Sequence, residues 1–259
     1  VVNFVDANYR TSEHKTIFGH SMAGAFVMRE FIADSTWFNS YIAASPGMEI
    51  SIVKDYKEYF SRSETKLKLL QGQTFYFTMG GLAAEGAENV QIVTELDSLF
   101  KQKAPKEFNW GYQYLPQHAH MTTPYATFYE GITKTFNDYQ PPTIVSYQQY
   151  IEQGGIKGIE KHYQQRANKY QTAEGVPDRY VRRLGGMLFD DNHKDEAIKL
   201  LITNSQKFPE SIWALNALAR LYDQHQQPKE SLITFEKALT LAKKQNSGGI
   251  DYLESEIKR

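Results

Sequence analysis

Short apolar runs alternate with amphipathic stretches from the start of the chain to Gln140. Four runs rich in apolar and β-branched residues predict strands, at 14–18, 40–45, 74–79 and 109–115. Apolar positions at helical spacing predict helices near 22–34, 50–61, 87–103 and 124–138. Because strand–helix alternation is typical of a parallel sheet with helices on both faces, this part of the chain predicts an α/β domain.

The pattern changes at Pro141-Pro142, which interrupts the alternation. From about residue 144 onward, polar Gln, Lys and Glu positions alternate with apolar ones at helical spacing, and no further strand is predicted. We therefore expect two domains, an α/β domain at 1–140 and an all-α domain at 141–259.

The helical part contains an internal repeat. The matching pairs are Leu184/Leu218, Gly185/Ala219, Leu188/Tyr222, Ala197/Ser231 and Leu201/Phe235. The two residues of every pair are separated by the same number of positions, which is the period of tetratricopeptide (TPR) repeats. Residues 178–245 resemble such repeats. The small residues among the pairs would let two helices approach closely. A generic helical bundle is the alternative. Since a free-standing solenoid usually needs about three repeats, we expect this tail to lean on the first domain or on a partner.

Composition narrows the classes of function. The 259 residues include 41% apolar and 14% aromatic residues, enough for a hydrophobic core. The net charge of −1 gives no electrostatic reason to bind nucleic acid or an anionic membrane. The absence of cysteine excludes disulfides and thiolate zinc sites, and no apolar run is long enough to predict a membrane span. We expect a soluble protein, cytoplasmic, periplasmic or secreted.

Candidate chemistry begins with "KTIFGHSMAGAFVMREF", residues 15–31, where a predicted strand turns sharply into a helix. A serine in such a corner sits in a strained turn that pushes its hydroxyl into solvent, so Ser21 is the candidate nucleophile. Gly19 and Ala23 are small because larger side chains would collide with the turn. The Met22 N–H, at the positive end of the helix, is the candidate oxyanion donor. The alternative for Ser21 is an ordinary helix N-cap.

A nucleophilic serine needs a base, and the usual chain order in this type of site is serine, acid, histidine. His118 and His120 follow the last predicted strand, where a loop at the carboxyl edge of the sheet would hold the base. We expect His120 to be that base. The two histidines could instead share a metal ion or be plain surface residues.

The acid should follow the 74–79 strand, in "GGLAAEGAENV". Glu85 is preferred and Glu88 is the alternative, although each could be a solvated charge or a favourable charge at a helix N-terminus. A serine–histidine dyad without a carboxylate is a further alternative.

Several motifs recur in the order found in a known enzyme family. They are "YRT" at 9–11, "GHSMAG" at 19–24, "FNSYIAASP" at 38–46, "HMTTP" at 120–124 and "YEGITKTF" at 129–136. Residues 4–139 thereby resemble the esterase branch of the α/β-hydrolases, which includes enterobactin esterases and esterase D-like enzymes. The resemblance implies Ser21 as nucleophile, His120 as base and no cofactor.

The chain also departs from that family. Ala23 replaces the usual glycine of the elbow, and the identity of the acid does not carry over. Members normally have a long segment before the "YRT" motif, which supplies the first strands and a second oxyanion donor. We therefore expect the α/β domain to be the C-terminal part of a hydrolase sheet, N-terminally incomplete, and inactive or poorly soluble alone.

The expected function is a serine carboxylic-ester hydrolase that forms an acyl-enzyme with a small ester or a siderophore-like lactone. The alternative is a TPR-type interaction or scaffolding protein with a degenerate hydrolase domain. Expected partners are the ester substrate and, through the helical tail, a protein or a second copy of the chain. Nucleic acid and membranes are not expected partners.

Overall fold

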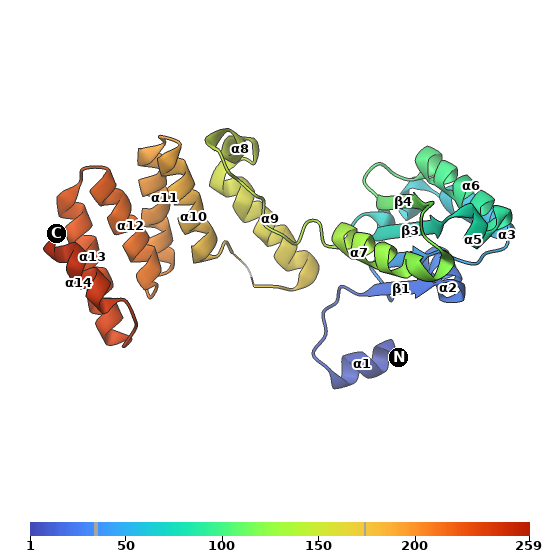
Figure 1. The fold of residues 1–259 in the computed structure, drawn as a ribbon, viewed down its shortest axis with the longest axis horizontal. Helices are drawn as coiled ribbons and strands as arrows, with labels where there is room; N and C mark the ends of the chain where they lie inside the picture. Colours follow the sequence, from blue (N-terminus) through green and yellow to red (C-terminus); the bar gives the residue numbers. More distant parts are fainter. Residues whose placement is uncertain (34–35, 174) are drawn as a thin grey trace. The chain divides into compact units, whose positions relative to one another are not determined.

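The computed structural model describes residues 1–33, 36–173 and 175–259. The chain divides into two compact units, each with its own elements (Figure 1). The first unit holds Val1–Gln140 and Lys169–Gln171, and the second holds Pro141–Asn168 and Thr172–Arg259. Within the described residues, every helix is too short or too polar to cross a bilayer.

A four-stranded parallel sheet forms the centre of the first unit. Its strands are β1 (Thr16–His20), β2 (Ser40–Ala44), β3 (Thr74–Gly80) and β4 (Asn109–Leu115), and they lie side by side in that order. All residues of β2 and β3 are buried, as expected for parallel strands covered on both faces. The parallel order brings the carboxyl ends of the four strands to one edge of the sheet.

The turn between the first strand and the helix begins slightly later than the sequence predicts. The first strand was expected at 14–18, but β1 continues to His20 because Gly19 and His20 pair with the last two residues of β2. The turn therefore begins at Ser21. The helix expected at 22–34 ends at Ile32, and residue 34 lies outside the described residues.

The helices of the first unit are α1 (Val2–Asn8), α2 (Met22–Ile32), α3 (Ser51–Phe60), α4 (Glu64–Leu67), α5 (Leu82–Glu85), α6 (Ala87–Lys103) and α7 (Thr123–Thr135), with the short helices η1 (Lys68–Leu70) and η2 (His120–Thr122). Helices α2, α3 and α6 on one face and α7 on the other cover the sheet. Helices α2, α3 and α6 share one hydrophobic core with the sheet. Helix α7 packs on the opposite face, where Gly131 leaves room for Ile42 of β2.

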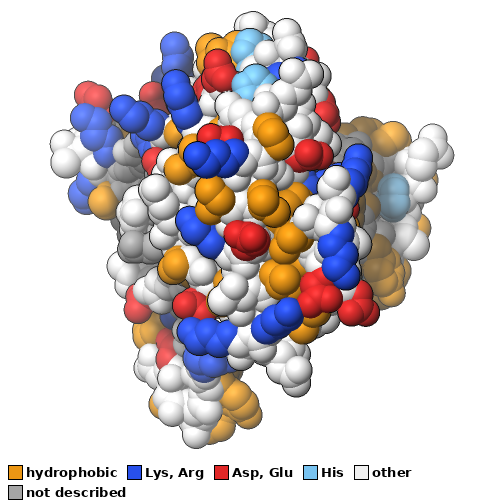
Figure 2. Space-filling model, turned by 90° about the vertical axis from the view of Figure 1, so that its left-hand side faces the viewer, with side chains coloured by type: hydrophobic (Ala, Val, Ile, Leu, Met, Phe, Trp, Pro, Cys, Tyr) orange, Lys and Arg blue, Asp and Glu red, His pale blue; other side chains and the backbone are white. Residues whose placement is uncertain are grey.

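The second unit contains helices only, among the residues described. They are α8 (Tyr147–Glu152), α9 (Gly155–Tyr170), α10 (Asp178–Asp190), α11 (Lys194–Lys207), α12 (Ile212–Gln224), α13 (Pro228–Lys244) and α14 (Ile250–Lys258). Helix α10 packs against α11, and α12 packs against α13. Figure 2 views the end of this unit formed by α13 and α14, where apolar side chains lie among charged ones.

The two helix pairs are offset by the period found in the sequence. Helix α10 begins at Asp178 and α12 at Ile212, so their starts are separated by the same offset as the matching residue pairs. Small residues lie where the helices of each pair meet. A Cβ on Gly185 would come within 2.7 Å of Leu201 Cδ2 in the first pair. In the second pair, Ser231 Oγ donates a hydrogen bond of 2.9 Å to the Ala219 carbonyl oxygen.

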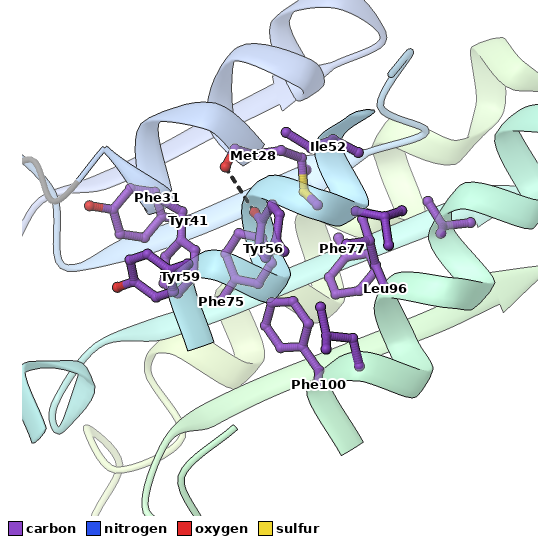
Figure 3. Packing of buried hydrophobic residues seen from close by; sticks show 14 of the residues in the cluster. Met28, Phe31, Tyr41, Ile52, Tyr56, Tyr59, Phe75, Phe77, Leu96 and Phe100 are labelled. Carbon is purple, nitrogen blue, oxygen red and sulfur yellow. Dashed lines mark hydrogen bonds between the residues drawn. The ribbon is translucent and has the colours of Figure 1, made fainter. Parts of the chain in front are cut away.

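An aromatic cluster forms the core beneath the sheet (Figure 3). Phe75 of β3 lies between Phe31 of α2, at a ring-centroid distance of 4.4 Å, and Phe100 of α6, at 5.4 Å. Tyr56 is fully buried and donates a 2.8 Å hydrogen bond to the Met28 carbonyl oxygen. Burial raises the pKa of Tyr56 well above its ordinary value, so it remains a neutral donor. The core therefore ties three helices to the central strands.

His14 lies near the opposite edge of the sheet, just before β1. Its Nε2 is 3.2 Å from Ser40 Oγ, and its ring packs against the rings of Phe136 and Tyr170. The pKa of His14 is lowered to about 4, chiefly by burial and then by the positive charge of Lys169, while Asp138 opposes the change. His14 is therefore neutral in the folded protein at neutral pH.

We expect the free energy of unfolding to depend on His14 in mildly acidic solution. In the unfolded chain a histidine titrates at about pH 6.5. Between that pH and about 4, the unfolded state binds a proton that the folded state does not, so stability falls as the pH falls through this window. A His14→Gln variant should lose less stability between pH 7 and pH 4.5 in urea titrations followed by circular dichroism. Equal losses in the two proteins would contradict this assignment.

Candidate active site

Ser21 connects β1 to α2 in a backbone conformation that is rare for a residue with a side chain. Its φ is 57° and its ψ is −120°, and its side chain forms no capping hydrogen bond to the helix. The peptide is held instead by its neighbours: the Ser21 N–H donates to the Ala44 carbonyl oxygen at 3.0 Å, and the Gly47 N–H donates to the Ser21 carbonyl oxygen at 3.2 Å. Strain of this kind persists where surrounding contacts enforce it, and it marks functional turns.

The small residues of the corner have identifiable reasons. A Cβ on Gly19 would lie 2.2 Å from the Ala23 carbonyl oxygen, so no side chain fits there. A Cβ on Gly24 would lie 3.1 Å from the Ala44 carbonyl oxygen, which makes that position tight as well. Met22 is the first residue of α2, and N–H groups in the first turn of a helix have no acceptor within the helix. The Met22 N–H therefore has no acceptor within its own helix.

Glu85 and His120 come together from separate loops. Glu85 is the last residue of α5, after β3, and His120 begins η2, after β4. Glu85 Oε2 lies 2.7 Å from His120 Nδ1. The Glu85 side chain is only 2% exposed, whereas that of His120 is 33% exposed. With Glu85 ionised, Nδ1 carries the donated hydrogen and Nε2 is left to accept a proton.

The second oxygen of the same carboxylate is also held. Ser45 Oγ donates to Glu85 Oε1 at 2.6 Å and accepts the Gly80 N–H at 3.3 Å. Ser45 is 1% exposed and has a φ of 39°, an unusual conformation directly after β2. A Cβ on Gly80 would lie 2.4 Å from Glu85 Oε1, so the glycine provides the space that the carboxylate occupies. The buried charge is thus bonded on both oxygens, as a buried carboxylate requires.

His20 links the loop of the serine to the loop of the histidine. Its Nε2 lies 2.9 Å from the His120 carbonyl oxygen, and the two imidazole rings have centroids 4.5 Å apart. Since His20 immediately precedes Ser21, the strained corner lies against the segment that carries His120. The structure therefore brings the loops that carry Ser21, Glu85 and His120 to one edge of the sheet, which is where open α/β sheets bind ligands.

Glu88 and His118, the other candidates from the sequence, have different surroundings in the structure. Glu88 is exposed in the first turn of α6, where its charge is favourable for the helix. The His118 carbonyl oxygen accepts the Gly81 N–H at 2.9 Å, which fixes the loop backbone. The described residues contain no group of three or more His, Asp or Glu side chains suited to a metal ion.

Sequence reasoning missed Ser45, although it lies inside the "FNSYIAASP" motif. The available signal was a polar residue directly after a fully apolar run at the end of a central strand. Such a residue is buried at the carboxyl edge and needs a polar partner there. The partner could not be assigned until the strand order placed β2 beside β3.

Comparisons with known proteins inform the fold. No protein-family model matches the chain, and no curated protein sequence matches it. The solved structure of an uncharacterised protein from Capnocytophaga ochracea DSM 7271 is similar over 99% of this chain and 71% of its own, with 11% identity and a TM-score of 0.67. This likeness supports the fold.

An IroE-like serine hydrolase from Shewanella oneidensis is also similar, over 93% of this chain and 63% of its own. The identity is 15% and the TM-score is 0.47.

The two glutamates offer a matched pair of variants that tests the geometry. We expect Glu85→Gln to slow covalent labelling of the protein by a fluorophosphonate by at least about 100-fold, because the imidazole would lose the carboxylate that orients it. Glu88→Gln changes the same charge by the same chemistry and should label at the unaltered rate. The measurement is the second-order labelling rate from gel fluorescence at several probe concentrations. Equal slowing in both variants would remove Glu85 from the site.

Proposed function

We propose that this protein is a serine carboxylic-ester hydrolase. The observation that carries the proposal is the strained Ser21, whose side chain does not cap the helix, on a corner in contact with the His120 segment, with His120 bonded to the buried Glu85. In this proposal Ser21 is the nucleophile, His120 the general base and Glu85 the acid. This combination of roles is the one that activates a serine for acyl transfer.

The reaction would proceed in two halves. Ser21 Oγ attacks the acyl carbonyl carbon while His120 Nε2 takes the hydroxyl proton, and the Met22 N–H donates to the oxygen that becomes negative. Glu85 stabilises the imidazolium. When the tetrahedral intermediate collapses, His120 returns the proton to the departing alcohol and the acyl group remains as an ester on Ser21.

Water completes the cycle. His120 removes one proton from a water molecule, whose oxygen attacks the acyl carbon of the Ser21 ester. The second tetrahedral intermediate releases the carboxylic acid, and the proton on His120 returns to Ser21 Oγ. No cofactor takes part in this scheme. The resemblance to the enterobactin esterases and esterase D-like enzymes favours a small ester or a siderophore-like lactone as the substrate.

A second candidate function has its own supporting observation. The helix pairs of the second unit repeat at the period of TPR units, which supports the TPR-like interpretation of 141–259. A groove in that unit is lined by arginine and aromatic side chains. The chain could therefore act as an interaction protein with a degenerate hydrolase domain. We favour the hydrolase because the buried Glu85 is bonded on both oxygens, an arrangement that a degenerate site has no reason to keep.

Hydrolysis of p-nitrophenyl acetate tests the proposal. Expressed with the upstream segment that the family resemblance implies, the wild-type protein should release p-nitrophenol with a burst equal to the enzyme concentration if deacylation is slow, and Ser21→Ala should abolish both burst and turnover. Mass spectrometry of the quenched protein should find the acetyl group on Ser21. An acetyl group on another residue, or equal turnover by Ser21→Ala, would reject Ser21 as the nucleophile. Absence of any turnover in a folded wild-type protein would favour the interaction protein.

Ser45 should act as a positioning residue for Glu85. Removing its hydroxyl takes one hydrogen bond from the carboxylate and leaves the Gly80 N–H without its acceptor. We expect Ser45→Ala to lower kcat about tenfold with little change in KM, the effect of losing one hydrogen bond to a charged group.

Ser40→Ala is the control for Ser45→Ala. Ser40, the first residue of β2, is as buried as Ser45, but it bonds His14 at the opposite end of the strand. It should leave kcat unchanged. Equal losses of kcat in the two variants would show a general effect of weakening β2.

A further inference from the structure

The carbonyl oxygen of His120 lacks the backbone donor that a helix would normally supply. His120 begins the short helix η2, and α7 follows directly from Thr123. In an α-helix this oxygen would accept the N–H group four residues later, but that residue is Pro124, which has no N–H. The Thr123 N–H donates instead to the Ala119 carbonyl oxygen at 3.3 Å. The His120 oxygen must therefore find its donors among side chains or in water.

Two side chains from different elements bond this oxygen. Thr123 Oγ1 donates to it at 2.9 Å. His20 Nε2 also lies 2.9 Å from it, and because a carbonyl oxygen can only accept, Nε2 must carry the hydrogen. Thr123 is the first residue of α7, whereas His20 is the last residue of β1 and the immediate neighbour of Ser21. One backbone atom of His120 thus joins α7 to the corner that carries the candidate nucleophile.

Thr123 is itself held by buried hydroxyl groups. Its Oγ1 lies 2.9 Å from Ser45 Oγ, and its carbonyl oxygen accepts the Thr127 hydroxyl at 2.7 Å. Thr127 Oγ1 lies in turn 2.6 Å from Thr78 Oγ1 of β3. All four residues are at most 1% exposed. A buried hydroxyl costs free energy unless it is hydrogen-bonded, whereas an apolar side chain would fill the space without that requirement. The hydroxyls therefore indicate a need for alignment between α7 and the sheet.

His120 is held at two places that share one neighbour. Its Nδ1 is bonded to Glu85 Oε2, and Glu85 Oε1 accepts the Ser45 hydroxyl. Its carbonyl oxygen is bonded to Thr123, which lies against the same Ser45 hydroxyl. A hydroxyl has one hydrogen, and hydrogen bonds to charged acceptors are the stronger ones, so Ser45 donates to the carboxylate. The Thr123 hydrogen then remains for the His120 carbonyl oxygen. The imidazole and the backbone of His120 thus belong to one closed ring of contacts.

We propose that Thr123 and His20 are positioning residues, which hold the backbone of His120 so that its imidazole keeps its bond to Glu85 beside the serine corner. Helix η2 has only three residues, and the hydrogen bonds of such short helices have poor geometry, so this turn does not fix its own backbone. The effect on turnover rests on the proposed function, in which His120 is the base. The effect on the position of the imidazole does not.

Proton NMR of the His120 Nδ1–H tests the proposal without relying on activity. In the wild-type protein, expressed as for the ester assay, this hydrogen should give a signal far downfield that Glu85→Gln removes. Thr123→Val keeps the shape of the side chain but removes its hydroxyl, and we expect the signal to move upfield and to exchange faster with water. Thr122→Val is the matched control, because the Thr122 hydroxyl is exposed and donates to the Ala119 carbonyl oxygen at 3.0 Å. It should leave the signal unchanged.

His20 is tested by keeping or removing its donor. His20→Leu cannot donate and should shift the signal as Thr123→Val does. His20→Gln places an amide N–H at nearly the reach of Nε2 and should restore the wild-type signal. Fluorophosphonate labelling of Ser21 should slow about tenfold in His20→Leu and Thr123→Val with the control Thr122→Val unaffected, and His20→Gln should recover most of the loss. Circular dichroism checks that each variant is folded.

The outcomes separate this proposal from the proposed function. A signal that Thr123→Val and His20→Leu leave unchanged would overturn the positioning role, and so would the absence of any downfield signal from the folded wild-type protein. Equal shifts in Thr122→Val and Thr123→Val would show a general loosening of the loop and would overturn it as well. A signal that shifts as expected, in a wild-type background that no fluorophosphonate labels, would support the positioning role and reject the hydrolase.

Discussion

The parallel pairing of four strands in one fixed register is the constraint on which the candidate site depends. Ser21, Ser45, Glu85 and His120 come from four different loops, and each loop follows a different strand. Because the strands run in the same direction, those loops meet at one edge of the sheet although they are far apart in the sequence. The backbone hydrogen bonds between neighbouring strands thus determine the position of side chains that are far apart in the sequence.

The geometry of the candidate site also depends on how one buried carboxylate is hydrogen-bonded. A carboxylate withdrawn from water is unfavourable unless every oxygen has a donor. Glu85 meets this condition through His120 on one oxygen and Ser45 on the other. The same bonds fix the orientation of the imidazole. The hydrogen bond from His120 therefore both stabilises the buried carboxylate and orients the base. The strain at Ser21 is likewise held by backbone hydrogen bonds to neighbouring loops.

Much of this architecture was predictable because it follows from local patterns. The four strands were visible as apolar runs, and the corner was visible because glycine and alanine surround a serine. Glu85 and Glu88 were both candidates because both follow the same strand; the structure separates them by burial, which a single sequence does not display. Ser45 was not predicted because its role depends on the strand beside β2, and the sequence does not show which strand that is.

The missing Cβ of Gly80 links the chemistry to the integrity of the sheet. Oxygen Oε1 of Glu85 occupies the volume that any larger residue at that position would fill. A slip of β3 by one residue in the direction that replaces Gly80 with Met79 would place a side chain where the carboxylate lies and reverse the faces of the strand. Such a slip would therefore displace the Glu85 carboxylate as well as misalign the strand. Molecules with the slipped strand would be inactive, and they would add nothing to the measured turnover.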